Sequence, residues 1–298
     1  MKIAVMGGTG FIGGHLVEMY ARNGCEVIVV SRSQQPSERP GVRMVTWDEL
    51  ERSAEPLEGA DAFVNLSGES INQRWTNAAK ERILNSRLTA ADRVARLVDR
   101  LRDKPAVVVN ASGISIYGTS ENEVYDETCP ARVVDFLSGV VEQWERAIDR
   151  IQGPRVVKLR VGIVLGTDGG AFPKMALPYR LGVGGRIGTG RQWLSWIHIE
   201  DMVRVIDFCI RHDRIMGPVN ATAPHPVTND EFGRALGKAL RRPHLFPVPA
   251  FLFKLLFGEL SVLLLEGQKV VPRTLIDHGF EFRYPTIDQA LRQLIGKT

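Results

Sequence analysis

The sequence predicts an α/β fold in which a doubly wound parallel sheet is followed by a smaller, mostly helical C-terminal lobe. Near-continuous apolar runs alternate with helical segments over the first half of the chain, and a glycine cluster follows the first run. Apolar runs without polar alternation are typical of parallel strands that helices cover on both faces. Strict alternation of strand and helix then gives the doubly wound arrangement.

The individual elements follow from apolar spacing and from end signals. Short apolar runs predict strands over residues 3–6, 27–30, 42–47, 62–65, 107–110 and 156–161. Helical spacing predicts helices over 11–23, 76–102, 133–151 and 199–211. Capping boxes at Thr228–Glu231 and Thr286–Gln289 predict two further helix starts, the first for a helix that reaches Leu240.

The glycine cluster lies between the first strand and the first helix. It reads Gly-Gly-Thr-Gly-Phe-Ile-Gly over residues 7–13. Glycines there let the backbone turn sharply and approach a pyrophosphate, while the positive end of the helix faces the phosphates. This context indicates a Rossmann-type dinucleotide-binding domain. Its candidate cofactor-binding residues are Gly7, Gly10, Phe11, Ile12 and Gly13.

The end of the second strand indicates which dinucleotide binds. NAD-binding folds usually place an acidic residue there to hold the ribose 2′-hydroxyl. This strand ends instead in Ser31 and Arg32. An arginine pairs with a 2′-phosphate and the serine hydroxyl adds a donor, so the sequence favours NADP(H). Alternatively, Arg32 is an ordinary surface arginine.

We expect the dinucleotide-binding domain to span residues 1–165, with 191–225 returning to it. Residues 166–190 and 226–298 would then form the C-terminal lobe. The glycine-rich stretch 166–190 lacks regular spacing, which favours a ligand-binding segment or a flexible lid. The apolar stretch 245–265 contains two prolines and two charged residues, is too interrupted to span a bilayer, and is expected to form a buried or interface helix.

Composition narrows the classes of partner. The net charge of +4 suits an anionic small molecule but is too weak to indicate nucleic acid. The three cysteines are widely spaced and lack metal-ligand spacing, so neither a disulfide framework nor a metal site is expected. These features favour a cytoplasmic protein with no membrane partner. A homodimer is compatible with the sequence.

Several motifs together resemble the extended short-chain dehydrogenase/reductases. They are the glycine cluster, Asn65–Gly68, Tyr117–Gly118, Leu159–Gly162 and Trp196–Asp201. More narrowly, the segments 68–75, 184–190 and 263–282 resemble "epimerase family" proteins, which carry a C-terminal domain of unknown function. This resemblance covers essentially the whole chain, and it is specific for a family rather than for a reaction.

The resemblance implies further cofactor contacts. The turn after the fourth strand would border the ribose and the pyrophosphate, Asp48 would accept from the adenine amino group, Arg74 would reach a phosphate, and Val161 would lie near the nicotinamide. Alternatively, Asp48 only starts a helix and Arg74 is a surface charge. The residues of that turn are Leu66, Ser67, Gly68 and Glu69.

The chain departs from the superfamily at its acid/base pair. Tyr-x-x-x-Lys occurs nowhere, and by position its two residues correspond either to Phe136 with Val140 or to Leu137 with Val141. Phenylalanine and leucine cannot exchange a proton, and valine cannot perturb a pKa. By position the partner serine corresponds to Gly113.

Three functions remain open after the sequence is read. The first is an NADP-dependent oxidoreductase or epimerase with a relocated acid/base, for which Ser112, Tyr117 and His198 are candidates. His198 is expected instead to have a structural role that connects the dinucleotide-binding domain to the C-terminal lobe. The second is a binding module that responds to NADP(H) without turnover. The third is a nucleotide-sugar epimerase, for which the usual acid/base pair is missing.

Overall fold

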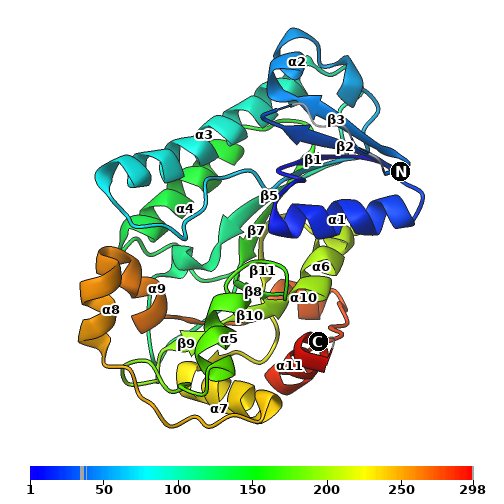
Figure 1. The fold of residues 1–298 in the computed structure, drawn as a ribbon. Coiled ribbons are helices and arrows are strands. Elements are labelled where there is room, and N and C mark those ends of the chain that lie inside the picture. The colour runs from blue at the N-terminus through cyan, green and yellow to red at the C-terminus, as the bar shows by residue number, and fades with distance from the viewer. Residues whose placement is uncertain (34–36, 38, 297–298) are drawn as a thin grey trace.

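A parallel sheet of seven strands forms the centre of the computed structural model, which describes residues 1–33, 37 and 39–296. The strands lie in the order β11-β7-β5-β4-β1-β2-β3, and every neighbouring pair is parallel (Figure 1). The order reverses beside β1, as in Rossmann folds. The strands are β1 (Lys2–Met6), β2 (Glu26–Ser31), β3 (Val42–Thr46), β4 (Ala62–Asn65), β5 (Val107–Gly113), β7 (Arg155–Val161) and β11 (Gly217–Ala221).

Helices cover both faces of this sheet, so the predicted fold class is confirmed. On one face, α1 (Phe11–Arg22) and α6 (Ile199–Arg211) bury side chains such as Ile3 and Val5. On the other, α3 (Asn77–Arg100) and α4 (Phe136–Ile148) bury Ala4 and Met6, together with the short helix α2 (Trp47–Arg52). Alternate residues of one strand thus enter opposite cores, which explains why the strands are apolar throughout.

The remaining elements build a smaller lobe below the ends of these strands (Figure 1). Its core joins α5, α7 and α11. The helices are α5 (Phe172–Arg180), α7 (Asn229–Leu240), α8 (Ala250–Phe257), α9 (Val262–Leu265), α10 (Arg273–Asp277) and α11 (Ile287–Gly296). The short strands, most of them in this lobe, are β6 (Val124–Tyr125), β8 (Ile163–Leu165), β9 (Trp193–Leu194), β10 (Trp196–His198), β12 (Val227–Thr228) and β13 (Lys269–Val270). Three short 3₁₀ helices are η1 (Glu55–Leu57), η2 (Ile114–Tyr117) and η3 (Gly258–Ser261).

Most predicted elements lie within three residues of their observed bounds. Helix α6 spans the predicted range, and α7 begins with the predicted capping box between Thr228 and Glu231. Helix α4 begins three residues late because Asp135 caps it by accepting a hydrogen bond from the Ser138 N–H. Strand β11 was not predicted, since it begins with Gly217 and Pro218, both poor strand formers.

Two expectations for the second half are wrong. The stretch 166–190 is not irregular throughout, because α5 occupies its middle. The stretch 245–265 does not form one helix, since Gly258 adopts a positive φ of 57° at the end of α8. Helix α8 contains no buried residue, so it is not the buried helix that was one of the two alternatives for this stretch, and the interface helix stays a prediction. Within the described residues, no helix is long and apolar enough to cross a membrane.

Candidate cofactor-binding site

The glycine turn has the geometry that a dinucleotide requires. Gly7 adopts a φ of 81°, a conformation that favours glycine, and its carbonyl accepts from the Gly10 N–H at 3.0 Å. Gly10 is the N-cap of α1, so the first N–H groups of that helix have no intrahelical partner. A Cβ on Gly13 would lie 2.2 Å from the Gly7 oxygen. The helix therefore approaches the turn as closely as only glycine permits.

A cavity of about 360 Å³ lies directly on this turn. Phe11, on its wall, packs against Gly166, Gly169 and Gly170 of the loop after β8, where a Cβ would lie 2.5–2.9 Å from the ring. His15 bonds both carboxylate oxygens of Asp168 in the same loop, at 2.9 and 3.1 Å. The loop after β8 is thus fastened beside the turn. The cavity is lined by Thr9, Gly10, Phe11, Gly14, His15, Glu18, Arg39 and Asp168.

The candidates for the adenosine end lie at the end of β2 and in α2. Ser31 donates to the Ser33 carbonyl at 2.5 Å, and Arg32 is exposed, with no ion pair among the residues that the structure describes. Asp48 is exposed in the first turn of α2, where its charge favours the helix N-terminus. Arg39, which the sequence reading did not single out, adds a cation on the cavity wall.

The turn after β4 lies against the glycine turn. The Leu66 N–H donates to the Met6 carbonyl at 2.9 Å, and a Cβ on Gly7 would lie 3.0 Å from the Leu66 carbonyl. Further along, the Glu69 N–H donates to the Ser86 hydroxyl at 2.9 Å. Ser67 and Gly68 between them are half-buried and exposed, respectively. The structure therefore brings Leu66 and Ser67 to the cofactor turn, while Glu69 contacts α3.

Two other predicted contacts have different surroundings. Arg74 is exposed in the loop that leads to α3. Val161 ends β7 half-buried and pairs with Gly113 of β5 and Ala221 of β11. Val161 therefore lies on the sheet edge where ligands bind in open α/β folds.

The positions that the sequence predicts for the superfamily's acid/base pair are apolar. A Cβ on Gly113 would lie 3.3 Å from the Val141 Cγ2 atom. Helix α4 buries Leu137, Val140 and Val141. Phe136 packs edge-on against Trp75, with ring centroids 5.3 Å apart. No proton-exchanging side chain stands at these four positions of α4.

Ser112 and Tyr117, the two catalytic candidates, belong to one buried polar network. The Ser112 hydroxyl donates to Glu145 Oε1 at 2.6 Å, and Arg160 forms two parallel hydrogen bonds to the Glu145 carboxylate, each 2.9 Å long. Arg160 also donates to the Tyr117 hydroxyl at 2.8 Å, and that hydroxyl donates to Asn220 Oδ1 at 2.8 Å. Tyr117 is fully buried. Burial outweighs the neighbouring Arg160 charge and raises the pKa of Tyr117 to about 12.

His198 joins the two lobes. It caps α6 by accepting from the Glu200 N–H, and its Nε2 lies 2.8 Å from Gln293 Oε1 on α11. It also packs against Tyr284, with ring centroids 4.0 Å apart. These contacts match the tying role that we expected for it.

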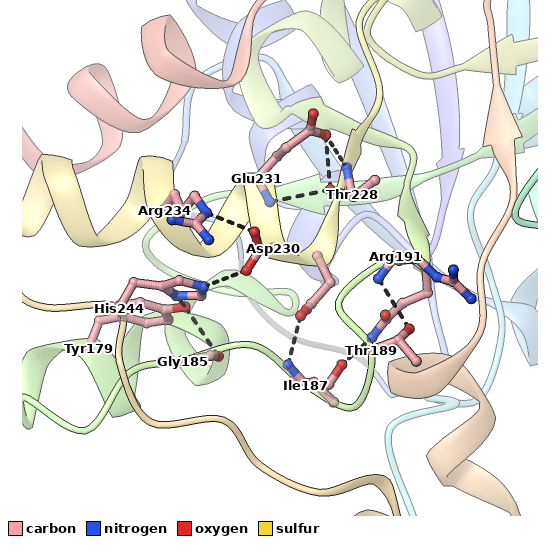
Figure 2. A network of polar contacts seen from close by, with 12 residues as sticks. Tyr179, Gly185, Ile187, Thr189, Arg191, Thr228, Asp230, Glu231, Arg234 and His244 are labelled. Atoms are coloured by element: carbon pink, nitrogen blue, oxygen red, sulfur yellow. Dashed lines mark hydrogen bonds and ion pairs between the residues drawn. The ribbon is translucent and has the colours of Figure 1, made fainter.

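The second glycine-rich loop, residues 184–190, is held by polar contacts (Figure 2). Asp230 Oδ1 lies 3.0 Å from His244 Nε2, and His244 Nδ1 lies 2.8 Å from the Tyr179 hydroxyl, which faces the Gly185 carbonyl at 3.4 Å. The Ile187 N–H donates to Asn229 Oδ1 at 2.9 Å. The adjoining Arg191 pairs with Glu121 at 3.1 Å. Polar contacts therefore hold this loop near both of its ends.

Sequence reasoning missed the partners that these groups use. Glu145 and Arg160 lie on different elements, and only the fold brings them together. Arg160, next to the buried Leu159 in the second half of β7, was the available signal, since a buried charge requires a partner.

These features define a dinucleotide-binding protein of the epimerase/dehydratase type, and comparison with known families agrees. The model of the NAD dependent epimerase/dehydratase family matches residues 3–221, and a domain of unknown function, DUF1731, matches residues 248–294. The chain belongs to the NAD dependent epimerase/dehydratase family. The resemblance stated from the motifs is thereby confirmed.

Similar proteins span the same length. The epimerase family protein YfhF of Bacillus subtilis is 41% identical, over 99% of this chain and 98% of that protein. The crystal structure of human epimerase family protein SDR39U1 with NADPH is 38% identical, has a TM-score of 0.93 and is covered completely, as is this chain. The nucleoside-diphosphate sugar epimerase from Corynebacterium glutamicum is 29% identical, with a TM-score of 0.80 over 100% of this chain and 58% of that one.

Proposed function

We propose that this protein binds NADP(H) at the glycine turn and does not act as a nucleotide-sugar epimerase. The observation that carries the first part is the combination of the closely packed turn at Gly7 and Gly13 with a basic, acid-free end of β2. The NADPH in the structure of human SDR39U1 supports the same cofactor. When bound, NADP(H) supplies or accepts a hydride.

The residues present fit this cofactor. The unpaired N–H groups of the first turn of α1 face the position of a pyrophosphate, and glycines keep side chains away from it. Arg32 and Ser31 fit a 2′-phosphate, with Asp48, Leu66, Ser67, Gly68, Glu69, Arg74 and Val161 as the remaining proposed contacts. Arg186 in the second glycine-rich loop and the adjoining Arg191, which pairs with Glu121, suit a small anionic substrate.

Cofactor selectivity tests the proposal. We expect NADPH to bind at least tenfold more tightly than NADH, because a charged hydrogen bond to the 2′-phosphate contributes about 1.5–3 kcal/mol. Arg32→Ala should remove most of that difference while NADH affinity stays unchanged. Titrations followed by tryptophan fluorescence measure both constants. Arg96→Ala, an exposed arginine paired with Asp92 on α3, is the control. Equal affinities for the two cofactors in the parent protein would contradict the proposal.

The absence of epimerase chemistry rests on the apolar side chains around Gly113. An acid/base group accelerates such proton transfers by about 10²–10⁴-fold, and Leu137, Val140 and Val141 supply none. A second function, that of an oxidoreductase, is favoured by one observation: Arg160 places a positive charge on the Tyr117 hydroxyl, as an activating cation would. Against it, Tyr117 is fully buried and its pKa is raised to about 12, so it is a poor base at neutral pH.

A turnover assay separates NADP(H) binding without epimerase activity from epimerase catalysis. We expect no interconversion of UDP-glucose and UDP-galactose by NMR after long incubation with protein and NADP(H). If interconversion occurs and is lost in Ser112→Ala or Tyr117→Phe, the protein is an enzyme that uses those residues. Interconversion that survives both substitutions would place the catalytic groups elsewhere.

The three cysteines form no disulfide, which suits the cytoplasmic location that we also propose. A homodimer remains a prediction for size-exclusion chromatography with light scattering.

A further inference from the structure

Two segments of the smaller lobe carry most of the exposed apolar side chains. Among the described residues, ten of the sixteen large apolar side chains that are exposed lie in residues 177–183 and 245–257. Leu181, Leu245 and Leu255 are 69%, 71% and 76% exposed. Monomeric soluble proteins rarely expose a large continuous apolar patch, and such a patch marks an interaction site.

Hydrogen bonds join the two segments side by side. The N–H groups of Leu245 and Phe246 both donate to the Gly184 carbonyl, at 3.0 and 3.2 Å, and the Val248 N–H donates to the Arg186 carbonyl at 2.9 Å. From there the chain runs along the outer edge of the lobe into α8 (Figure 1). The two segments therefore form one strip of surface, which we call the α8 face.

Helix α8 is apolar on all sides. Its eight residues, Ala250–Phe257, include one charged side chain, Lys254, and none of the eight is buried by the rest of the chain. Phe251 and Leu255 lie one turn apart and point to the same side of the helix. A helix that is apolar all round is normally buried in a core or in a membrane. This helix therefore needs a partner that the chain itself does not supply.

The charges along the α8 face have one sign. Residues 169–199 and 232–258, which contain the face, include nine lysines and arginines and no aspartate or glutamate. Arg241, Arg242 and Lys254 are exposed, and none of the three forms an ion pair with a residue that the structure describes.

The acids nearest in sequence are already engaged. Glu231 completes the capping box of α7, and Glu259, directly after α8, pairs with Lys80 on α3. Asp230 pairs with Arg234. The unpaired charge at the α8 face is therefore positive, which suits an anionic partner.

We propose that the α8 face binds the surface of an anionic lipid bilayer, with α8 lying in the plane of the interface. Its phenylalanines and leucines enter the boundary between headgroups and acyl chains, and the neighbouring arginines and lysine pair with lipid phosphates and carboxylates. This contact needs no spanning segment, and it replaces the expectation of no membrane partner. It does not depend on the proposed NADP(H) binding.

Two other occupants match the α8 face less well. A symmetric dimer places the same surface against itself, so the cations of the two copies would oppose each other without an acid between them. Nucleic acid would pair with the cations, but its contacts with proteins are mostly polar and would leave the apolar side chains of α8 in water. A lipid surface uses both the charge and the apolar side chains.

Sedimentation with vesicles tests the proposal. The vesicles consist of phosphatidylcholine alone, or of phosphatidylcholine and phosphatidylserine at about 3:1. We expect the protein to bind the mixed vesicles at least about tenfold more strongly than the neutral ones, and less strongly at high salt, which screens the headgroup charge.

Variants separate the apolar from the electrostatic contribution. Phe251→Glu combined with Leu255→Glu should weaken binding to the mixed vesicles about tenfold or more, because it removes apolar side chains and adds negative charge. Arg241→Gln combined with Arg242→Gln should weaken binding several-fold and reduce its salt dependence. The melting temperature should stay that of the parent, because the four replaced side chains are exposed.

Met216→Glu and Arg214→Gln are the matched controls. Met216 is 67% exposed, close to Phe251 at 65%, and Arg214 is exposed as well. Both precede β11 and lie outside the α8 face. Neither change should alter binding to the mixed vesicles.

Three results would overturn the inference, and each leaves the proposed NADP(H) binding intact. One is equal binding to the two kinds of vesicle, or binding to neither. The second is undiminished vesicle binding by the variant with Phe251→Glu and Leu255→Glu. The third is a dimer in light scattering that this variant dissociates, or binding of a DNA duplex that this variant retains, in a protein that does not bind the mixed vesicles.

Discussion

Gly13→Val should abolish measurable NADPH binding while some folded protein remains. The new Cβ would lie 2.2 Å from the Gly7 oxygen and 2.8 Å from the Gly8 Cα. Both are backbone atoms, so no side chain can rotate to relieve the clash. Either α1 moves away from β1 or the turn changes shape, and each displaces the N–H groups that face the phosphates.

Stability should fall in the same variant, by about 1–3 kcal/mol, as for other overpacked core positions. Thermal unfolding measures this loss, and calorimetric titration with NADPH measures binding. Gly139→Ala on α4 is the control. A Cβ there meets only Val133 Cγ1 at 3.7 Å, so this change should raise stability by about 0.5–1 kcal/mol and leave NADPH affinity as it is. A Gly13→Val protein that binds NADPH normally would show that the glycines serve only a turn.

The sequence predicted the sheet well because its signals are local. Each of the strands β1, β2 and β4 is a short run of residues buried in two cores. Consecutive apolar side chains in the sequence predict that burial. Caps such as Thr228 with Glu231 act over four residues and are equally local. Prediction was poorer for α8, where an apolar stretch lies exposed, because apolar composition does not show whether a partner element covers it.

The candidate site was predictable in part for the same reason. The residues that identify the glycine turn as a dinucleotide site lie within seven consecutive positions, and the end of β2 follows at a known distance in sequence. Arg87 on α3, which donates to the Glu69 carbonyl, and Arg160 beside Glu145 depend on contacts between elements that are distant in sequence. Helix periodicity gave no reason to single out Arg87 among the many charged residues of α3. Only the packing of α3 against α4 reveals its contact with the Trp144 ring.

Arg160→Met should destabilise the fold by about 3–5 kcal/mol, since removal of one partner leaves a buried charge unpaired. Glu145 would lose both hydrogen bonds from the guanidinium and keep only the Ser112 hydroxyl, and Tyr117 would lose its donor. Urea unfolding followed by circular dichroism measures the shift in midpoint. Lys158→Met on the same strand is the control, because its ion-pair partner Asp149 is exposed to solvent and surface pairs contribute about 0–1 kcal/mol.

The double variant Arg160→Met, Glu145→Leu shows whether the network stabilises the fold or serves chemistry. Replacing both buried charges with apolar side chains of similar size is often neutral, so much of the lost stability should return. Any NADPH affinity that Arg160→Met loses through its lower stability should also return toward that of the parent, because neither residue contacts the glycine turn in the described structure. If stability returns but NADPH affinity stays low, Arg160 acts on the cofactor and the network belongs to the binding site. If neither returns, the hydrogen bonds to Ser112 and Tyr117 stabilise this part of the fold more than the charge pair does.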